Sequence, residues 1–352
     1  MDTLTHALSG ALLARATAPA ERRSDQLSNN ERMAVGFAAA VFPDVDFFLR
    51  FIDPLTYLNL HRSFLNSVLL LPLWALLLAL LFSLLLFYRR YTWRACFGVC
   101  AMAMAIHIVG DVITSFGTMI FAPVSFARIS WPTTFIIDPY FSAILIAGVT
   151  ASLVWKAKRL PAITALAVLA VYVGFQGVLH ARGLSVAERY AAANKLVGAE
   201  THALPQPFSP FNWMLVTLHE NVYHIAYVNL MHTTVAPIPE NAGWLRRIAA
   251  AYRPVDEALW SRTPQFGQPA AVAQFVKQVW MQERLQPYRE FALLPALYRV
   301  DNQGRNVCVW FRDLRFALVG RNPIFPFGLC RRNDSDAWVL HRLTGAGVPE
   351  PL

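Results

Sequence analysis

The sequence predicts a mainly helical membrane protein, in which a polytopic bundle of about six apolar segments precedes a small α+β domain outside the membrane. Of its 352 residues 56% are hydrophobic and 15% charged, and the mean hydropathy of +0.38 is too high for an ordinary soluble protein. The long apolar runs lie in the first half, whereas the second half mixes charge, proline and short alternating stretches. We therefore expect a membrane domain over residues 1–180, a linker over 181–204 and an extramembrane domain over 205–352.

The net charge of +9 would favour nucleic-acid binding in a soluble protein. Many of the basic residues, however, lie in short loops at the ends of apolar runs, a pattern typical of membrane orientation, so no nucleic-acid partner is expected. The positive-inside rule places the loops within 15–32, 89–94 and 156–159 in the cytoplasm. Six segments then leave both termini and the C-terminal domain on the extracytoplasmic side.

The first two apolar segments are short helices, over residues 3–16 with His6 and over residues 33–42. Pro43 ends the second helix, because proline disfavours helical geometry in the residue before it. Asp44 and Asp46 then lie in a turn, where both carboxylates can face one ion.

The next two segments are longer. His61 and Arg62 precede an apolar run over residues 64–87, which is long enough to span a bilayer. The run over residues 95–121 carries His107 and Asp111, which a spacing of four places on one face of a helix. Ionisable groups at membrane depth cost a few kcal/mol, so they indicate function. Two further spans follow over 135–155, where Asp138 lies at the outer start, and over 160–179.

The second half has strand and turn patterns. Residues 211–218 and 222–228 alternate around a turn and predict a hairpin, and apolar residues over 272–280 recur at helical spacing. Further hairpins are expected around Asn302-Gln303-Gly304 and around residues 333–336. Cys308 and Cys330 fall on strand-like stretches and could pair in a disulfide if this half lies outside the cytoplasm.

The polar residues of the first half predict a metal site. Alone, a membrane histidine is more often a packing residue, and an aspartate pair after a helix is as often a turn exposed to water. Together, on one side of the expected topology, they suit zinc, manganese or iron, and they suffice for two ions to clamp a phosphoryl group. The candidate ligands are His6, Asp44, Asp46, His61, His107 and Asp111.

The order of these motifs resembles a known family. The runs that carry the resemblance, within residues 1–180, are MDTLTHALSGALLARA, FPDVDF, HRSFLNS and HIVGDVITSFGTM. They are similar to the LexA-regulated, membrane-bound metal-dependent hydrolases of the YdjM family. The resemblance implies a location in the bacterial inner membrane and a metal-dependent hydrolase.

One position departs from the family pattern. The family usually reads His-Arg-x-x-Thr-His-Ser, whereas this chain has Asn66 in place of the second histidine. Asparagine offers a carbonyl oxygen or a hydrogen bond to a ligand, but it binds zinc poorly, so Asn66 is expected as a weak ligand or a ligand's partner.

The expected function is hydrolysis of a phosphoester by metal-activated water, with a lipid or lipid-linked phosphate as substrate because the ligands lie at membrane depth. Asp138 is the candidate general base, and Arg62 is the candidate for holding a substrate phosphate, although an interfacial arginine also extends to the membrane surface without such a role. Two alternatives stay open: a non-enzymatic transporter or scaffold whose buried polar groups bind an ion in passage, and a degenerate metal-binding member. The sequence gives no oligomeric state.

Overall fold

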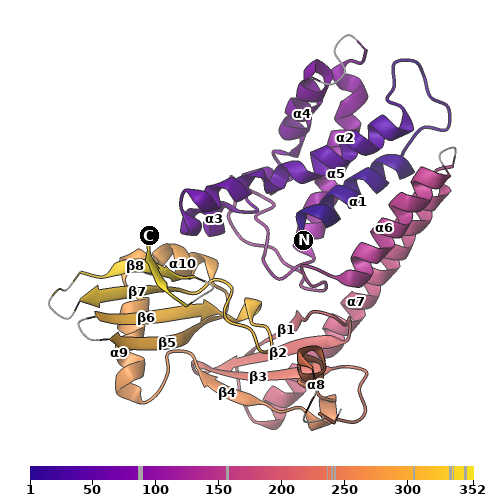
Figure 1. Ribbon diagram of the computed structural model, residues 1–352. Coiled ribbons are helices and arrows are strands. Elements are labelled where there is room, and N and C mark those ends of the chain that lie inside the picture. Colours follow the sequence, from indigo (N-terminus) through magenta and orange to yellow (C-terminus); the bar gives the residue numbers. More distant parts are fainter. Residues whose placement is uncertain are drawn as a thin grey trace. The chain divides into compact units, whose positions relative to one another are not determined.

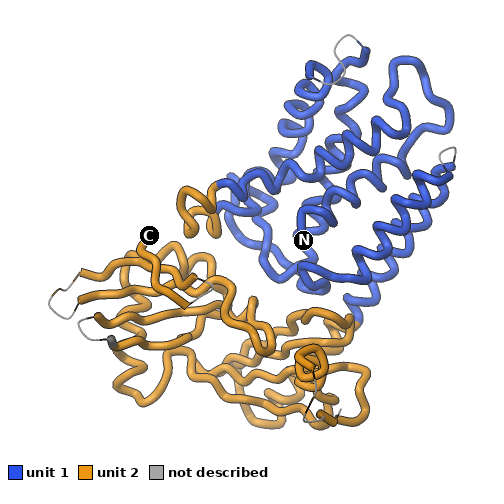
Figure 2. Tube along the Cα trace, viewed as in Figure 1, with its two compact units in different colours: residues 1–48, 60–178 blue, residues 49–59, 179–352 orange. Residues whose placement is uncertain are grey.

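The computed structural model describes residues 1–85, 90–155, 158–235, 237–238, 241, 243–303, 306–332, 335, 337–344 and 347–352. It divides into two compact units, which Figure 2 colours separately. Unit 1 comprises Met1–Phe48 and Leu60–Val178, and unit 2 comprises Leu49–Asn59 and Leu179–Leu352. Each unit has hydrophobic clusters of its own.

Unit 1 is helical (Figure 1). Its elements are α1 (Thr3–Ala16), α2 (Asn29–Val41), most of the 3₁₀ helix η1 (Phe42–Phe51), η2 (Phe64–Asn66), α4 (Leu71–Leu85), α5 (Trp93–Val112), α6 (Pro139–Val154) and the first part of α7 (Leu160–Ala193). Buried alanines of α2, α4 and α5, including Ala39, Ala75 and Ala103, form one cluster. Small residues at these positions allow the helices to pack closely.

Two glycines set the contact between α1 and α2. A Cβ atom added at Gly10 would lie 2.3 Å from the carbonyl oxygen of Gly36 and 2.5 Å from the Cβ of Ala40. A Cβ added at Gly36 would lie 2.5 Å from the carbonyl oxygen of Gly10. Backbone therefore packs directly on backbone here, and the crossing fixes the position of Ala40 relative to α1.

The number of expected membrane spans requires correction. Among the described residues, α5 and α7 are long and apolar enough to cross a membrane, and the pair Pro54–Asn66 and Leu71–Leu85, bent by 81°, would make a third if it is one span. Helices α1 and α2 have 14 and 13 residues, well below the roughly 20 that a bilayer requires, and α6 has 16. Six spans are therefore wrong, and the orientation inferred from them stays a prediction.

Unit 2 contains two antiparallel sheets (Figure 1). The first has the order β1 (Glu200–Pro205), β2 (Asn212–His219), β3 (Val222–Asn229) and β4 (Ser261–Pro264). The second has the order β5 (Pro295–Gln303), β6 (Asn306–Asp313), β7 (Phe327–Arg332), β8 (Val339–Leu343) and β9 (Pro349–Pro351). The helices of this unit are α3 (Pro54–Leu60, up to Asn59), the end of α7, α8 (Trp244–Ala250), α9 (Ala270–Trp280), α10 (Gln286–Phe291) and the short 3₁₀ helices η3 (Val255–Glu257), η4 (Glu283–Leu285) and η5 (Leu314–Phe316).

The first sheet buries both faces. Successive side chains of a strand point to opposite faces, so Trp213 and Leu215 belong to one cluster while Met214 and Val216 belong to another. The first cluster includes Val186 from the end of α7. The C-terminal part of α7, a helix long and apolar enough to cross a membrane, therefore contributes to the core of unit 2.

The second sheet carries a disulfide and an aromatic cluster. Cys308 of β6 and Cys330 of β7 are directly opposite partners and form a disulfide. Trp280 of α9 packs on Phe311 of β6, with ring centroids 4.7 Å apart. Helix α9 thus covers one face of this sheet.

Most of the expectations for the second half are confirmed. β2 and β3 form the expected hairpin, and α9 is the expected amphipathic helix. In the hairpin expected around residues 302–304, Gln303 pairs with Asn306, and Gly304 lies outside the described residues. Residues 333, 334 and 336 of the other expected hairpin also lie outside them, as do residues 89 and 156 of the basic loops. Residues 181–193, expected as linker, continue α7, and β1 begins at residue 200.

Replacement of Gly36 by alanine tests the α1–α2 crossing. We expect Gly36→Ala to lower the stability of the detergent-solubilised protein by about 1–3 kcal/mol, because the added methyl group overpacks the contact. Gly98→Ala is the matched control, since a Cβ at Gly98 meets nothing within 4 Å and alanine favours the helix. Equal thermal midpoints for the two variants would contradict the close crossing.

Candidate metal centre

Helix α5 presents two buried ionisable side chains. His107 and Asp111 lie on one face, as their spacing predicts, and the side chains of both are 0% exposed. The Nε2 atom of His107 lies 3.2 Å from Oδ2 of Asp111. A carboxylate without solvent contact requires cationic or hydrogen-bonding partners, so the surrounding elements must supply them.

Helix α1 supplies an imidazole. Asp2 caps this helix by accepting a hydrogen bond from the backbone N–H of Thr5, and His6 follows one turn later. The ring of His6 stacks on the ring of His107 with centroids 3.7 Å apart, and Nε2 of His6 lies 3.0 Å from Oδ1 of Asp111. Two imidazolium rings at this distance would repel each other, so the stack favours at least one neutral ring.

The segment after α2 supplies the second carboxylate. Helix α2 ends at Val41, as Pro43 predicts, but the following residues form η1 rather than an open turn. Oδ1 of Asp44 lies 3.8 Å from Nε2 of His107, and Oδ2 accepts a hydrogen bond of 2.9 Å from the hydroxyl of Thr3.

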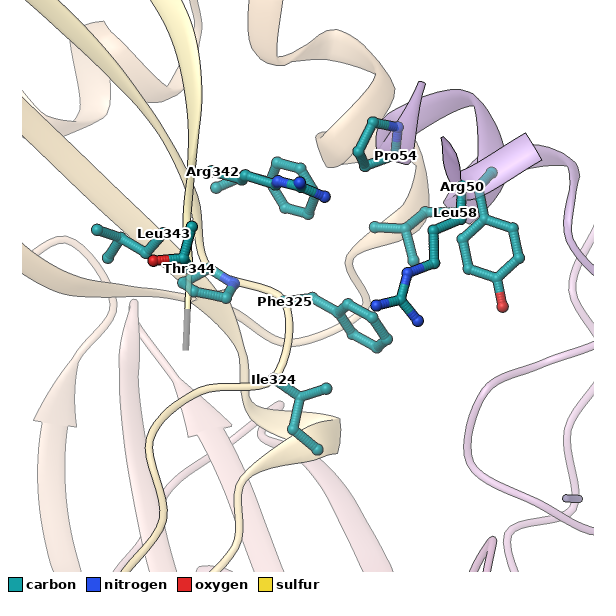
Figure 3. A pocket seen from close by; sticks show the side chains of 11 residues that line it. Arg50, Pro54, Leu58, Ile324, Phe325, Arg342, Leu343 and Thr344 are labelled. Carbon is teal, nitrogen blue, oxygen red and sulfur yellow. The ribbon is translucent and has the colours of Figure 1, made fainter. Parts of the chain in front are cut away.

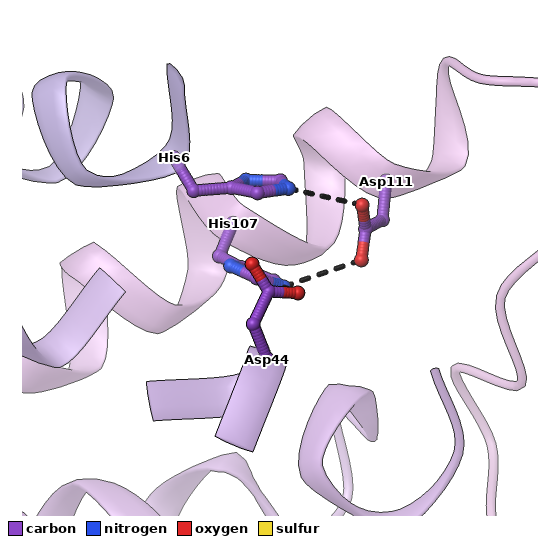
Figure 4. Close-up of side chains that lie close together, drawn as sticks. All are labelled: His6, Asp44, His107 and Asp111. Carbon is purple, nitrogen blue, oxygen red and sulfur yellow. Dashed lines mark hydrogen bonds and ion pairs between the residues drawn. The ribbon is translucent and has the colours of Figure 1, made fainter. Parts of the chain in front are cut away.

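Four of the six candidate ligands therefore meet. One ligand atom from each of His6, Asp44, His107 and Asp111 lies within 4.8 Å of the others, and Figure 4 shows the four side chains facing one another. Two imidazole nitrogens and two carboxylate oxygens at this spacing match the donor set of zinc, manganese or iron sites. The arrangement joins α1, η1 and α5, which lie far apart in the sequence.

Asp46 and His61 lie outside this group. Nδ1 of His61 is 2.8 Å from Oδ1 of Asp46, and both side chains are about nine-tenths buried, with exposures of 11% and 9%. The reason is the 3₁₀ geometry of η1, in which three residues make a turn and side chains two apart point about 240° apart around the axis. Asp44 consequently faces His107, whereas Asp46 faces His61.

A backbone contact determines which nitrogen of His107 faces the group. Nδ1 of His107 lies 2.7 Å from the carbonyl oxygen of Ala40, an acceptor only, so Nδ1 carries the proton and donates. Nε2 is buried and makes no hydrogen bond within the described part of the chain, although it faces both carboxylates. Metal-binding histidines commonly donate their other ring N–H to a backbone carbonyl in this way.

Asp111 has further partners. Its carboxylate accepts a hydrogen bond of 2.6 Å from the α-ammonium of Met1 and one of 2.8 Å from Nδ2 of Asn66, and it forms an ion pair of 3.0 Å with Arg62. Asn66 thus contacts a candidate ligand, and its Oδ1 has no hydrogen-bond partner among the described residues. These contacts offset the negative charge of Asp111.

Arg62 is buried and has several partners. Its backbone has φ 63°, a left-handed conformation that is unusual outside glycine, and its carbonyl accepts a hydrogen bond from Met119. The guanidinium group donates to the Oγ1 of Thr114 at 2.7 Å and lies over the ring of Phe116 at 4.8 Å. The side chain of Arg62 is 2% exposed and forms an ion pair with Asp111. The expected role of Arg62 in holding a substrate phosphate stays a prediction.

Asp138 lies at the start of α6 as the N-cap. Its carboxylate accepts hydrogen bonds from the backbone N–H groups of Tyr140 and Phe141 and from the hydroxyl of Tyr172. These contacts stabilise the end of a helix. The expected role of Asp138 as a general base stays a prediction.

Sequence reasoning missed several partners of the site. The hydroxyl of Thr3, the carbonyl of Ala40 and the α-amino group of Met1 each contact a member of the group. No sequence motif marks a backbone carbonyl or a chain end. Thr114, three residues after Asp111, could have been found from helical spacing, because it bonds both the carbonyl of Asp111 and Arg62.

Comparison with known proteins gives results for the first half of the chain. The family described as YdjM inner membrane protein matches residues 1–183. The chain is 27% identical over 176 residues to the "Uncharacterized protein YfhP" of Bacillus subtilis (strain 168), an alignment covering 50% of this chain and 52% of that protein. The chain thus spans about half the length of that relative. No solved structure matches the chain.

The matched region contains all the elements of the four-residue group and more than half of the chain. On this basis the chain belongs to the YdjM inner membrane protein family.

Proposed function

We propose that the chain is an integral membrane hydrolase that depends on a divalent metal ion and cleaves a phosphoester of a lipid or lipid-linked substrate. The observation that carries the proposal is the group of His6, Asp44, His107 and Asp111, whose ligand atoms lie within 4.8 Å of one another. A divalent ion in such a group can activate water and polarise a phosphoryl oxygen. Zinc is the favoured ion, with manganese or iron as alternatives.

The tautomer of His107 supports an ion in this group. Because Nδ1 donates to Ala40, Nε2 is the ring atom that faces the two carboxylates, and without a proton it presents a lone pair to them. That arrangement is repulsive unless a cation or a proton lies between the three groups. The buried Nε2 without a hydrogen bond is therefore suited to a metal ion.

The pair of Asp46 and His61 suits proton transfer. Nδ1 of His61 donates to the carboxylate of Asp46, which orients the ring and places the accepting lone pair on Nε2. The backbone N–H of Arg62, the next residue, also lies 3.3 Å from Asp46. We assign this pair the role of general base, and Arg62 the role of holding Asp111 in position.

The position of the group supports a lipid substrate. Two of its members lie on α5, one of the helices long and apolar enough to cross a membrane. A water-soluble ester would not require ligands on such a helix, whereas a lipid-linked phosphate reaches them from the bilayer. The extracytoplasmic side, inferred from the basic loops, is part of the proposal.

A second candidate function is that of a degenerate family member, in which the four residues bind an ion weakly or form a polar network without an ion. The contacts of Asp111 favour it, because the Met1 ammonium, Arg62 and Asn66 already satisfy much of its charge. Asn66 also stands where the YdjM family usually has a histidine, so this chain lacks that ring nitrogen as a ligand. This candidate predicts little metal in the wild type and recovery of metal in Asn66→His.

Metal content separates the two candidates. After exposure to zinc and removal of loosely bound ions, we expect about one ion per chain in the wild type and less than about a tenth in His107→Ala, because loss of one of four donors opens the site. His61→Ala is the matched control, since it also removes a buried imidazole but leaves the group intact. Equal zinc in the wild type and His107→Ala, measured by mass spectrometry, would contradict the assigned ligands.

Hydrolysis distinguishes the metal group from the proton-transfer pair. Short-chain phosphatidic acid and phosphatidylglycerol serve as probes, with released phosphate and organic phosphate as the readouts. We expect His61→Ala to keep its zinc while turnover falls by about 10²-fold or more, the usual contribution of general acid–base catalysis. Loss of zinc together with turnover in His61→Ala would instead make His61 a ligand. Zinc binding without turnover of either probe by the wild type would count against the proposed substrates.

A further inference from the structure

Unit 2 contains a pocket that is lined neither by the four residues of the metal group nor by Asp46 and His61. Its volume is about 450 Å³, within the range of roughly 300–1,000 Å³ that small-molecule sites occupy. Three segments form it: residues 50–58, the loop and strand start at 324–327, and the end of β8 with Thr344 (Figure 3). The pocket therefore joins the end of η1 and helix α3 to the second sheet.

Both charged side chains that line the pocket are arginines. The guanidinium groups of Arg50 and Arg342 extend from opposite walls toward the space between them (Figure 3). Nε of Arg342 donates to Oε2 of Glu350 at 2.6 Å, and this hydrogen bond lowers the pKa of the Glu350 carboxyl. Glu350 offsets part of the charge of Arg342 from outside the lining, whereas both charged side chains of the lining itself are cationic.

The remaining walls are largely apolar. Leu58, Phe325 and Leu343 supply apolar surface, and Tyr57 and Thr344 add two hydroxyl-bearing side chains to the lining. The hydroxyl of Thr344 hydrogen-bonds the backbone of Val348. Guanidinium groups bind phosphate through paired N–H donors, whereas apolar walls accommodate an uncharged body. The combination suits an anionic phosphate ester better than a bare inorganic ion.

The residues next to Arg50 point to a source for such a ligand. Phe51 and Ile52 are 72% and 81% exposed, and both are large apolar side chains. Exposed apolar residues beside an arginine are typical of a membrane interface, where acyl chains and phosphate groups lie close together.

We propose that this pocket is a second site, separate from the metal group, which binds the phosphate of an anionic phosphate ester between Arg50 and Arg342. The favoured source is the head group of an anionic glycerophospholipid, and a soluble phosphate ester shares the same chemistry. The site does not require that the metal group be catalytic. Occupancy would tie the last turn of η1 to the second sheet of the same unit.

Calorimetric titration of the full chain in a neutral maltoside detergent tests the proposal. The probes are dihexanoyl phosphatidylglycerol, sn-glycerol 3-phosphate and inorganic phosphate. We expect Arg50→Gln and Arg342→Gln each to weaken binding of the phosphate-ester probes by about tenfold or more, because each removes charge-assisted hydrogen bonds to the phosphate. Arg284→Gln is the control, since Arg284 is exposed and does not line the pocket.

A filling variant makes the test independent of charge. Thr344→Trp narrows the pocket while both arginines remain, and it should also weaken binding. Binding of the lipid probe alone identifies the phospholipid head group, and equal binding of glycerol phosphate identifies a soluble ester. No binding of either ester by the wild type, or equal binding by the wild type and both arginine variants, overturns the site. Zinc content, measured in parallel, reports separately on the metal group.

Discussion

The buried carboxylate of Asp111 is the constraint on which the arrangement of the first unit depends. It lies on an apolar helix with no solvent contact, where an uncompensated charge is costly. Its partners come from both directions along the chain: His6 and the Met1 ammonium from the N-terminal end, Arg62 and Asn66 from the region before α4. Satisfying one side chain thus brings together segments more than a hundred residues apart.

The packing of the helices determines where these partners of Asp111 lie. The direct backbone contact of Gly10 with Gly36 brings α1 against α2, and the carbonyl of Ala40 at the end of α2 then orients His107. Each step has a local cause. Small residues allow the helices to cross closely, and the carbonyl oxygen of Ala40, which can only accept a hydrogen bond, selects the tautomer of His107. The proposed metal binding depends on this orientation, because it directs Nε2 of His107 toward the carboxylates of Asp44 and Asp111.

The sequence predicted some parts of the site because their causes are local. The shared face of His107 and Asp111 follows from helical spacing alone, and the end of α2 follows from Pro43. The separation of Asp44 from Asp46 could not be predicted, since a turn and a 3₁₀ helix satisfy the same proline but direct the second carboxylate differently. The number of spans failed because an apolar run in the sequence does not show where its helix ends: α1 and α2 have 14 and 13 residues, below the roughly 20 that a bilayer requires.

The most direct test of the account is the position of a bound ion in crystals of the full chain grown with zinc, located by anomalous scattering at the zinc edge. The account predicts one peak about 2.0–2.2 Å from a ring nitrogen of His6, from Nε2 of His107 and from oxygens of Asp44 and Asp111. A peak on Asp46 and His61 instead, or crystals in which Asp111 keeps only the Met1, Arg62 and Asn66 contacts and no ion binds among the four residues, would contradict it.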